Sequence, residues 1–366
     1  MRVPYSYLRE QFADSESILR DIKGLLESTD FTLGAAVTQF EESFAQLCGT
    51  RHAIGVGTGT DALFLPLKAL GVGPGDEVIT AANTFIATAG AITAAGARPA
   101  FVDVGDDFNL DPAAVEPAIT PRTKAILPFL YAGQPAKMAS ILEVAKGHGL
   151  PVVEDACQAI GATIGDRLVG TFGVTAGFSL HPLKNLNVWG DGGVIVTSSD
   201  ALDGQLRLLR NHGLRNRDEV EVFGYNSRLD TLQAIVGNHL IKDVEAITTA
   251  RIRNARALDV GLADLAGRVR IPPRDPGERH VFHLYMFEAD DRDRLLTHLV
   301  SRGIEAKIHY PVPLHLQPSY RTWGLGPGAF PVAEAAAGRL VSLPLFPQLT
   351  EAEIAAVVSA VLEFHG

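Results

Sequence analysis

Lys184 is the residue whose type and position point most directly to chemistry. It lies in the loop sequence Ser-Leu-His-Pro-Leu-Lys-Asn-Leu-Asn-Val-Trp-Gly-Asp-Gly-Gly, between two short apolar segments. A lysine in a partly dry pocket has a lowered pKa, and its free amine can attack a carbonyl carbon to form an imine. The chain has only eight lysines. A lone loop lysine is usually a surface charge, so its role depends on what the fold brings near it.

Asp155 strengthens the case for chemistry at Lys184. It ends the apolar run Leu-Pro-Val-Val-Glu-Asp, and a parallel sheet delivers such strand ends into a binding crevice. A carboxylate there can pair with the protonated ring nitrogen of pyridoxal phosphate, which keeps that ring an effective electron sink. Because side chains alternate along a strand, we expect the neighbouring Glu154 to face the opposite side. A strand-end aspartate alone is more often a cap or a structural ion pair.

A glycine-rich turn supplies a third element. Residues 55 to 63 read Gly-Val-Gly-Thr-Gly-Thr-Asp-Ala-Leu, a strand end followed by the start of a helix with free N–H groups. The turn lacks both the Lys-Ser/Thr ending of a triphosphate loop and the spacing of a dinucleotide motif, so it suits a monophosphate better. Phe85 follows the next strand and is placed to stack on a flat ring, although most phenylalanines belong to the core.

Other kinds of site find less support in the sequence. No pair of histidines has a recognised ligand spacing with carboxylate support, so we expect no metal. The two cysteines cannot form a disulfide framework, and we expect them to be reduced and partly buried. The residues considered were His181, His212, His283, His309, His315, Cys48 and Cys157.

Composition narrows the class of protein. The 366 residues are 46% hydrophobic and 20% charged, which is typical of a soluble globular protein with a large core. A net charge of −10 argues against broad binding to nucleic acid. No apolar stretch approaches the roughly 20 residues of a membrane span. The first residues, Met-Arg-Val-Pro-Tyr-Ser-Tyr, lack the pattern of a secretory signal, so we expect a cytoplasmic protein.

These candidate residues must be positioned by an α/β unit. From about residue 51 to 197, short β-branched runs alternate with Ala/Leu-rich helical runs, which predicts a mostly parallel sheet covered on both faces. The last two strands are separated by a loop instead of a helix. The expected strands are 52–56, 77–80, 99–102, 123–128, 150–154, 177–180 and 194–197, and the expected helices are 61–70, 85–95 and 136–148.

The pattern changes after Asn226. A long helical stretch is expected over residues 229–263, followed by prolines and then a smaller α+β unit. In that unit we expect strands at 283–288 and 306–308 and helices at 292–302 and 351–364. The predicted division is an N-terminal arm of residues 1–30 packed beside the main domain, a large α/β domain of 31–240 and a small C-terminal α+β domain of 241–366.

Six segments, taken in order, resemble one known family. They are Gly-Thr-Asp-Ala-Leu, Asn-Thr-Phe-Ile-Ala-Thr, Glu-Asp-Ala-Cys-Gln-Ala-Ile-Gly-Ala, Ser-Leu-His-Pro-Leu-Lys-Asn, Gly-Tyr-Asn-Ser-Arg-Leu-Asp and Lys-Ile-His-Tyr-Pro-Val-Pro-Leu-His-Leu-Gln. The chain is similar over nearly its whole length to DegT/DnrJ/StrS keto-sugar aminotransferases. The resemblance implies the aspartate aminotransferase fold (fold type I), pyridoxal phosphate as cofactor and a homodimer with shared active sites.

The resemblance also implies a role for each matching residue. Lys184 would be the Schiff-base lysine and the proton shuttle, Asp155 would pair with the pyridine nitrogen, and Gln158 would approach the ring hydroxyl. The other implied cofactor contacts are Gly59, Thr60 and Ser179 at the phosphate, Phe85 on the ring, and Asn226 from the partner subunit. The implied contacts to a sugar substrate are Tyr5, Trp189, His309 and Tyr310.

The expected function is transfer of an amino group, with glutamate as the expected donor, to a ketone of a nucleotide-activated sugar. Two alternatives stay open at this point. The same scaffold serves amination of a keto-inositol or of an eight-carbon sugar, and some relatives were first described as regulators that bind the cofactor without turnover. The chain has no appended DNA-binding module and no basic stretch that would favour a regulator.

Overall fold

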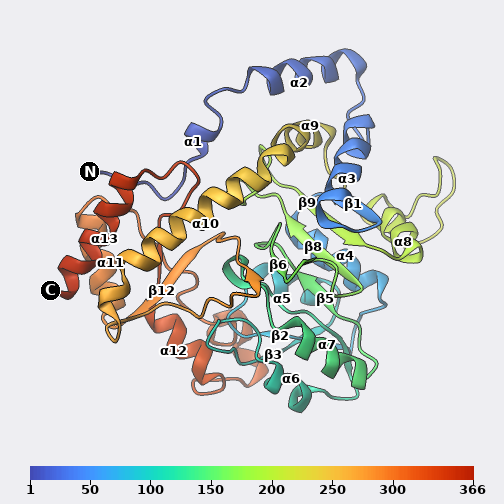
Figure 1. Cartoon of the computed structure of the whole chain (residues 1–366). Coiled ribbons are helices and arrows are strands. Elements are labelled where there is room, and N and C mark those ends of the chain that lie inside the picture. The colour runs from blue at the N-terminus through green and yellow to red at the C-terminus, as the bar shows by residue number, and fades with distance from the viewer.

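The computed structural model describes all residues from Met1 to Gly366. Its centre is a sheet made of two hydrogen-bonded groups of strands, seen in the middle of Figure 1. The first group has the order β3 (Arg98–Val102), β2 (Glu77–Ala81), β4 (Thr123–Ile126), and the second has the order β5 (Val153–Asp155), β8 (Thr175–Ser179), β9 (Gly193–Thr197), β1 (His52–Val56). Parallel bridges from Ile126 to Val152 and from Phe129 to Asp155 join β4 to β5.

The sheet is mostly parallel, as predicted. β2 runs parallel to β3 and β4, and β5 runs parallel to β8. β9 is antiparallel to both β8 and β1, because the chain returns from β8 through a loop instead of a crossover helix. The carboxyl ends of β5 and β8 therefore open at the same edge, and the β8–β9 loop lies across that edge.

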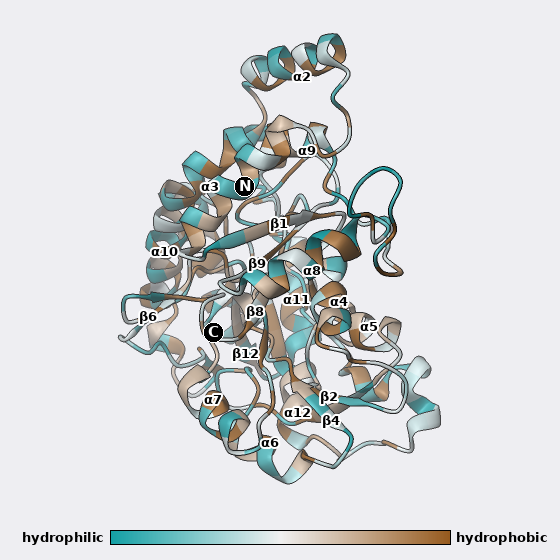
Figure 2. Cartoon of the chain, turned by 90° about the vertical axis from the view of Figure 1, so that its right-hand side faces the viewer, coloured by the Kyte–Doolittle hydropathy of each residue, from teal (hydrophilic) through white to brown (hydrophobic).

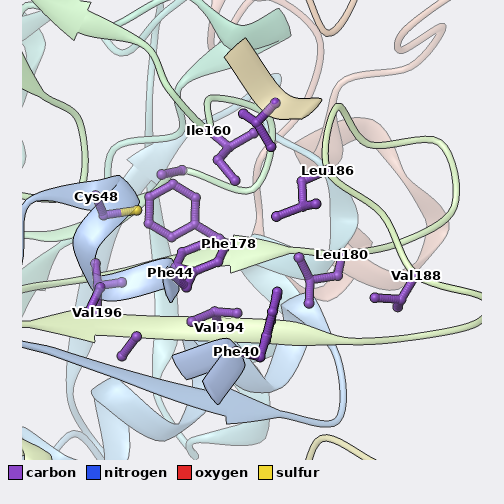
Figure 3. Packing of buried hydrophobic residues seen from close by; sticks show 14 of the residues in the cluster. Phe40, Phe44, Cys48, Ile160, Phe178, Leu180, Leu186, Val188, Val194 and Val196 are labelled. Atoms are coloured by element: carbon purple, nitrogen blue, oxygen red, sulfur yellow. The ribbon is translucent and has the colours of Figure 1, made fainter. Parts of the chain in front are cut away.

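Helices cover the sheet on both faces. α3 (Ala35–Cys48) packs against β1 and α9 (Thr231–Leu240), and α4 (Gly59–Ala69) packs against β8 and β9. Figure 3 shows Phe40, Phe44 and Cys48 of α3 directed at side chains of β8 and β9, and the ring centroids of Phe44 and Phe178 lie 5.3 Å apart. The remaining helices of this unit are α5 (Ile86–Ala94), α6 (Pro112–Ala118), α7 (Met138–Gly147) and α8 (Asp200–Arg210).

The long helical stretch predicted over residues 229–263 is interrupted. α9 ends at Leu240, a 3₁₀ turn covers Ile241–Asp243, and α10 continues from Val244 to Gly261. α10 then packs against α13 (Glu351–His365). The remaining 3₁₀ segments are Tyr131–Gly133, Ala263–Leu265, Leu314–Leu316 and Pro318–Trp323.

The C-terminal part forms a second core. An antiparallel sheet with the order β10 (Val269–Arg270), β12 (Tyr285–Ala289), β13 (Leu340–Leu343) packs with α11 (Arg292–Ser301) and α13, while α12 (Pro331–Arg339) contacts β12. The strand predicted at 306–308 is wrong, because only Lys307 forms an isolated bridge, to Ser342. A short hairpin of β6 (Thr163–Ile164) and β7 (Arg167–Leu168) pairs with β11 (Glu278–Arg279). The predicted domain limits stay a prediction.

The residues of the predicted N-terminal arm pack in two places. Val3 forms a parallel bridge with Ile304, and Tyr7 stacks on Phe346, so the first residues are part of the C-terminal core. After α1 (Leu8–Gln11), the helix α2 (Glu16–Ser28) packs against α9 through Ile18 and otherwise stands apart from the body of the molecule, as Figure 2 shows at its top. The arm contacts both cores because its apolar residues lie in two short segments: Val3 and Tyr7 belong to the C-terminal core, and Ile18 belongs to the core of the large sheet. No helix in the structure is both long enough and apolar enough to cross a membrane.

Candidate active site

The candidate site is a cavity of about 480 Å³ at the carboxyl ends of β5 and β8. The loop after β8, the β1–α4 turn and the start of α5 close its sides. Nine of the predicted site residues line it although they come from segments far apart in the sequence: Gly59, Thr60, Phe85, Asp155, Gln158, Ser179, Lys184, His309 and Tyr310.

Asp155 lies at the floor of the cavity and is only 2% exposed. Its Oδ2 accepts a hydrogen bond from Thr88 Oγ1 at 2.6 Å, and its Oδ1 accepts one from the backbone N–H of Cys157 at 3.2 Å. Burial raises the pKa of Asp155, and the bond from Thr88 opposes that rise more than any other group. The carboxylate is thus held in one orientation while part of it still faces the cavity.

Lys184 lines the same cavity. Burial lowers the pKa of its amine, and the nearby Cys157 and Asp155 partly oppose that shift. The loop around it is fixed by two backbone contacts: Lys184 N donates to His181 O at 2.8 Å, and the buried Asn187 donates to Lys184 O at 3.1 Å. A lysine with a lowered pKa supplies more of the free amine that nucleophilic attack requires.

The β1–α4 turn forms an anion cradle. Thr58 caps α4 by accepting a hydrogen bond from the N–H of Asp61, so the N–H groups of Gly59 and Thr60 stay free of helix partners. Gly59 packs so closely on Ser179 that a Cβ on the glycine would lie 2.6 Å from the serine Cβ. Free N–H groups and a hydroxyl at a helix N-terminus are the donors that a phosphate needs.

Gln158 and Tyr310 form one wall of the cavity. Gln158 Oε1 accepts from the backbone N–H of Ala132 at 2.7 Å, and its Nε2 donates to the Tyr310 hydroxyl at 3.3 Å. Phe85 lines the same cavity and is 43% exposed, and its ring centroid lies 5.4 Å from that of Tyr310. The two rings leave an exposed aromatic face next to the polar wall, which suits a flat ring with polar substituents.

Three histidines line the cavity. Burial lowers the pKa of His309 to about 4, and burial lowers the pKa of His283 and of His181 as well. At neutral pH these side chains are therefore uncharged imidazoles, each with one donor and one acceptor nitrogen. His309 already bonds Ser342 through Nδ1 at 2.8 Å.

Three predicted site residues lie outside the cavity. Tyr5 lines a smaller adjoining cavity of about 80 Å³ that shares His283, His309 and Leu183 with the first. Trp189 packs edge-on against Phe12, and its indole N–H has no partner. Asn226 is exposed and pairs with Asn211 at the base of a protruding loop. Within a single chain, Tyr5 therefore lies next to the main cavity, whereas Trp189 and Asn226 do not line either cavity.

A buried ion pair links the anion cradle to the segment that carries Asn226. Glu41 on α3 is 6% exposed, accepts from the N–H of Gly55 at 2.8 Å and pairs with Arg210. Arg210 donates to Gly55 O at 2.9 Å, and its own carbonyl accepts from the N–H of Ser227 at 2.9 Å. One ion pair therefore fixes both the start of the cradle and the residue next to Asn226.

The sequence reasoning missed this pair and the two threonines behind Asp155. Thr84 lies two residues before α5 and Thr88 lies in its first turn, and this spacing of two hydroxyls in a mainly apolar segment is a signal that could have marked them. No local signal could have paired Glu41 with Arg210, because 169 residues separate them.

The structure can hold a flat molecule with one phosphate and one carbonyl group. The phosphate would meet the cradle, the ring would lie between the aromatic face and Asp155, and the carbonyl would face Lys184. The donors and acceptors of the cavity therefore fit pyridoxal phosphate.

Comparisons with known proteins agree with this geometry. The pattern of the DegT/DnrJ/EryC1/StrS aminotransferase family matches residues 13–362. A "Pleiotropic regulatory protein" of Geobacillus stearothermophilus is 43% identical over 100% of this chain and 99% of its own length. The UDP-N-acetyl-3-dehydro-alpha-D-glucosamine 3-aminotransferase of Acidithiobacillus ferrooxidans is 42% identical over 100% of this chain and 98% of its own.

The fold is shared as well. The crystal structure of Streptomyces venezuelae DesV in complex with a ketimine intermediate superposes with a TM-score of 0.96, at 41% identity over 99% of this chain and 98% of that one. Sequence pattern, near-complete coverage and fold coincide with a cavity that holds the lysine and the aspartate, and the chain belongs to the DegT/DnrJ/EryC1/StrS aminotransferase family.

Proposed function

We propose that this protein is a pyridoxal phosphate-dependent aminotransferase that moves an amino group onto the ketone of a nucleotide-activated sugar. The observation that carries the proposal is the meeting of Lys184 and Asp155 in one cavity beside the Gly59–Ser179 cradle. When bound, pyridoxal phosphate supplies an aldehyde that takes up an amino group and a ring that accepts electron density.

The chain's own residues divide the work of the reaction. Asp155 would accept a hydrogen bond from the protonated ring nitrogen, and the cradle would hold the phosphate. Lys184, with its lowered amine pKa, would hold the aldehyde carbon of the cofactor and would carry a proton during the transfer of the amino group. Gln158 would bond the edge of the ring, and Phe85 would pack on its face.

The relatives support a sugar as the acceptor. The Acidithiobacillus protein is named for amination at carbon 3 of a UDP-linked sugar, and it matches this chain along its whole length. We assign glutamate as the amino donor and a ketone on the ring of a nucleotide sugar as the acceptor. Tyr5, His309 and Tyr310 stand where such a sugar would enter, since the first lines the adjoining cavity and the others line the main one.

We place a second copy of the chain at the open side of the site. Asn226 is exposed beside a loop in which Phe223 is 98% exposed, and both are outside the cavity of their own chain. In a homodimer, this loop would bury its apolar residues and bring Asn226 to the phosphate cradle of the partner. A protein that is monomeric by light scattering and fully active in the same sample would overturn this arrangement.

A regulator without turnover is the competing function, because one similar chain is named a pleiotropic regulatory protein. The two functions differ in one measurement. If the protein is an aminotransferase, adding glutamate should convert the bound cofactor to its amino form. The visible absorbance of the bound pyridoxal phosphate should then disappear. A binding protein keeps that absorbance unchanged.

Lys184 provides the direct test of the proposal. Borohydride reduction should fix the cofactor on the peptide that contains Lys184, and mass spectrometry should find no other labelled lysine. Lys184→Ala should lose activity beyond detection while its melting temperature stays close to that of the wild type. Lys137→Ala, at an exposed lysine 3.8 Å from Asp106, is the matched control and should keep full activity. A label on any other lysine contradicts the mechanism.

A further inference from the structure

Two buried hydroxyls stand behind Asp155. Thr84 follows β2, and Thr88 lies in the first turn of α5. Their Oγ1 atoms are 2.7 Å apart, and Thr88 Oγ1 is 2.6 Å from Asp155 Oδ2. All three side chains are almost fully buried, with exposures of 1%, 0% and 2%. They form a continuous row from the end of β2 to the floor of the cavity.

The direction of the row follows from counting protons. An ionised carboxylate can only accept hydrogen bonds, and a threonine hydroxyl has a single proton to give. Thr88 must therefore donate its proton to Asp155, which leaves Thr84 as the donor to Thr88. Both hydroxyl dipoles then point at the carboxylate, and bonds in such a chain strengthen one another.

Another threonine of the same helix shows that this arrangement is not what α5 imposes. Thr93 Oγ1 donates to the helix's own carbonyls, to Ala89 O at 3.0 Å and Gly90 O at 2.9 Å. Local bonds of that kind are common for threonine in helices. The Thr88 hydroxyl instead reaches a residue 67 positions away.

We propose that Thr88, supported by Thr84, is a positioning residue that fixes the Asp155 carboxylate and keeps it ionised for the ring nitrogen of pyridoxal phosphate. The inference rests on the proposed function. Each oxygen of Asp155 accepts one bond from the protein, from Thr88 or from Cys157 N–H, so each keeps a lone pair for the cofactor. The ring nitrogen then meets a carboxylate that cannot turn away.

The charges around Asp155 agree with this role. The groups that face it are Lys184, the Cys157 thiol and the Tyr310 hydroxyl. Burial raises the pKa of Asp155, and the hydrogen bond from Thr88 is the largest influence that lowers it.

The test compares three variants of the full-length protein. Thr88→Val keeps the shape and removes the hydroxyl, Thr88→Ser keeps the hydroxyl, and Thr93→Val is the control on the same helix. We expect Thr88→Val to weaken the binding of pyridoxal phosphate to the apo-protein by about tenfold or more, because a hydrogen bond to a charged group is lost. The other two variants should stay within about threefold of the wild type.

The second readout is the pH at which the visible absorbance of the bound cofactor changes. Thr88→Val should shift this pH in the same direction as Asp155→Asn, and by less. In the Asp155→Asn background, Thr88→Val should cause no further shift, because the charge through which it acts is gone. Thr84→Val removes only the outer bond, so it should give a smaller shift of the same sign and should fold even if Thr88→Val does not.

The outcomes separate the two levels of the argument. If wild-type protein does not take up pyridoxal phosphate on Lys184, the proposed function fails and the inference fails with it. If the wild type binds the cofactor and the valine variants at 84 and 88 leave both affinity and absorbance unchanged, only the inference is overturned. An equal shift from Thr88→Val with and without the Asp155 charge would also overturn it, because Thr88 would then act on packing alone.

Discussion

Glu154 and Asp155 are neighbours on one strand, and the protein treats them in opposite ways. Glu154 is 0% exposed and accepts three backbone N–H bonds of 2.7 Å, from Gly170, Phe172 and Gly173. Asp155 is almost as buried but accepts only one hydroxyl and one N–H, and part of it faces the cavity. Burial raises the pKa of both carboxyls.

The difference shows how to tell a structural carboxylate from a functional one at equal burial. A structural carboxylate has its lone pairs used by the protein, and Glu154 in this way closes the 170–173 turn beneath the sheet. A functional one is left incompletely bonded at some cost to stability, and a ligand completes it. Four predictions test this difference and the surroundings of Asp155, from the largest effect to the smallest.

Asp155→Asn should give the largest effect, a loss of turnover of about 10²–10³-fold, since the charge that stabilises the protonated ring is removed. Cofactor attachment through Lys184 should persist. Steady-state rates with glutamate and a keto-sugar acceptor, together with borohydride labelling of Lys184, measure both. A variant that turns over at the wild-type rate would show that the strand-end carboxylate has no part in the reaction.

Glu154→Gln should mainly affect stability. Its amide nitrogen would oppose a backbone N–H that now donates to Glu154, so the free energy of unfolding should fall by about 1–3 kcal/mol. The rate per folded molecule should change less than about threefold. Urea unfolding and activity assays on the same sample measure the two quantities. If the variant loses activity but not stability, Glu154 belongs to the site and the distinction drawn above is wrong.

The pH dependence of the apo-protein gives a third comparison. A group whose pKa is raised in the folded state contributes stability below its unfolded pKa and loses that contribution as pH rises through the folded pKa. At pH 7 the Asp155 carboxylate is therefore a cost to folding, and Asp155→Asn apo-protein should melt at a higher temperature than the wild type. The gap should close toward pH 4. Because Glu154 is present in both proteins, it cancels in this difference.

Cys157→Ala should give the smallest effect. The thiol lines the cavity, but the bond to Asp155 comes from the Cys157 backbone N–H, which alanine retains. We expect turnover within about threefold of the wild type and a small change in the pH dependence of the cofactor absorbance. A loss of a hundredfold would show that the thiol itself takes part.

Local patterns were sufficient to predict the central part of the fold and the positions of two residues that line the cavity. Alternation along β5 placed Asp155 and Glu154 on opposite sides, and the glycine-rich run placed Gly59 at a helix start; both were found. The prediction of a strand at 306–308 was wrong. Only Lys307 in this segment pairs, and its partner Ser342 is distant in sequence, so the local pattern could not show how short the pairing is. The spacing of Thr84 and Thr88 is visible in the sequence, but the bond from Thr88 to Asp155 and the Glu41–Arg210 pair are not, because 67 and 169 residues separate their partners.

The Glu41–Arg210 pair has a consequence for how the proposed dimer responds to dilution. It holds Gly55 at the start of the phosphate cradle and, through Ser227, the segment next to Asn226. Cofactor binding and subunit association then act on one rigid unit and become linked equilibria. The coupling is reciprocal: the free energy by which bound cofactor strengthens subunit association equals the free energy by which association strengthens cofactor binding. A preparation stripped of pyridoxal phosphate should therefore dissociate at higher protein concentration than the loaded enzyme, and diluting the loaded enzyme should release cofactor and subunits together.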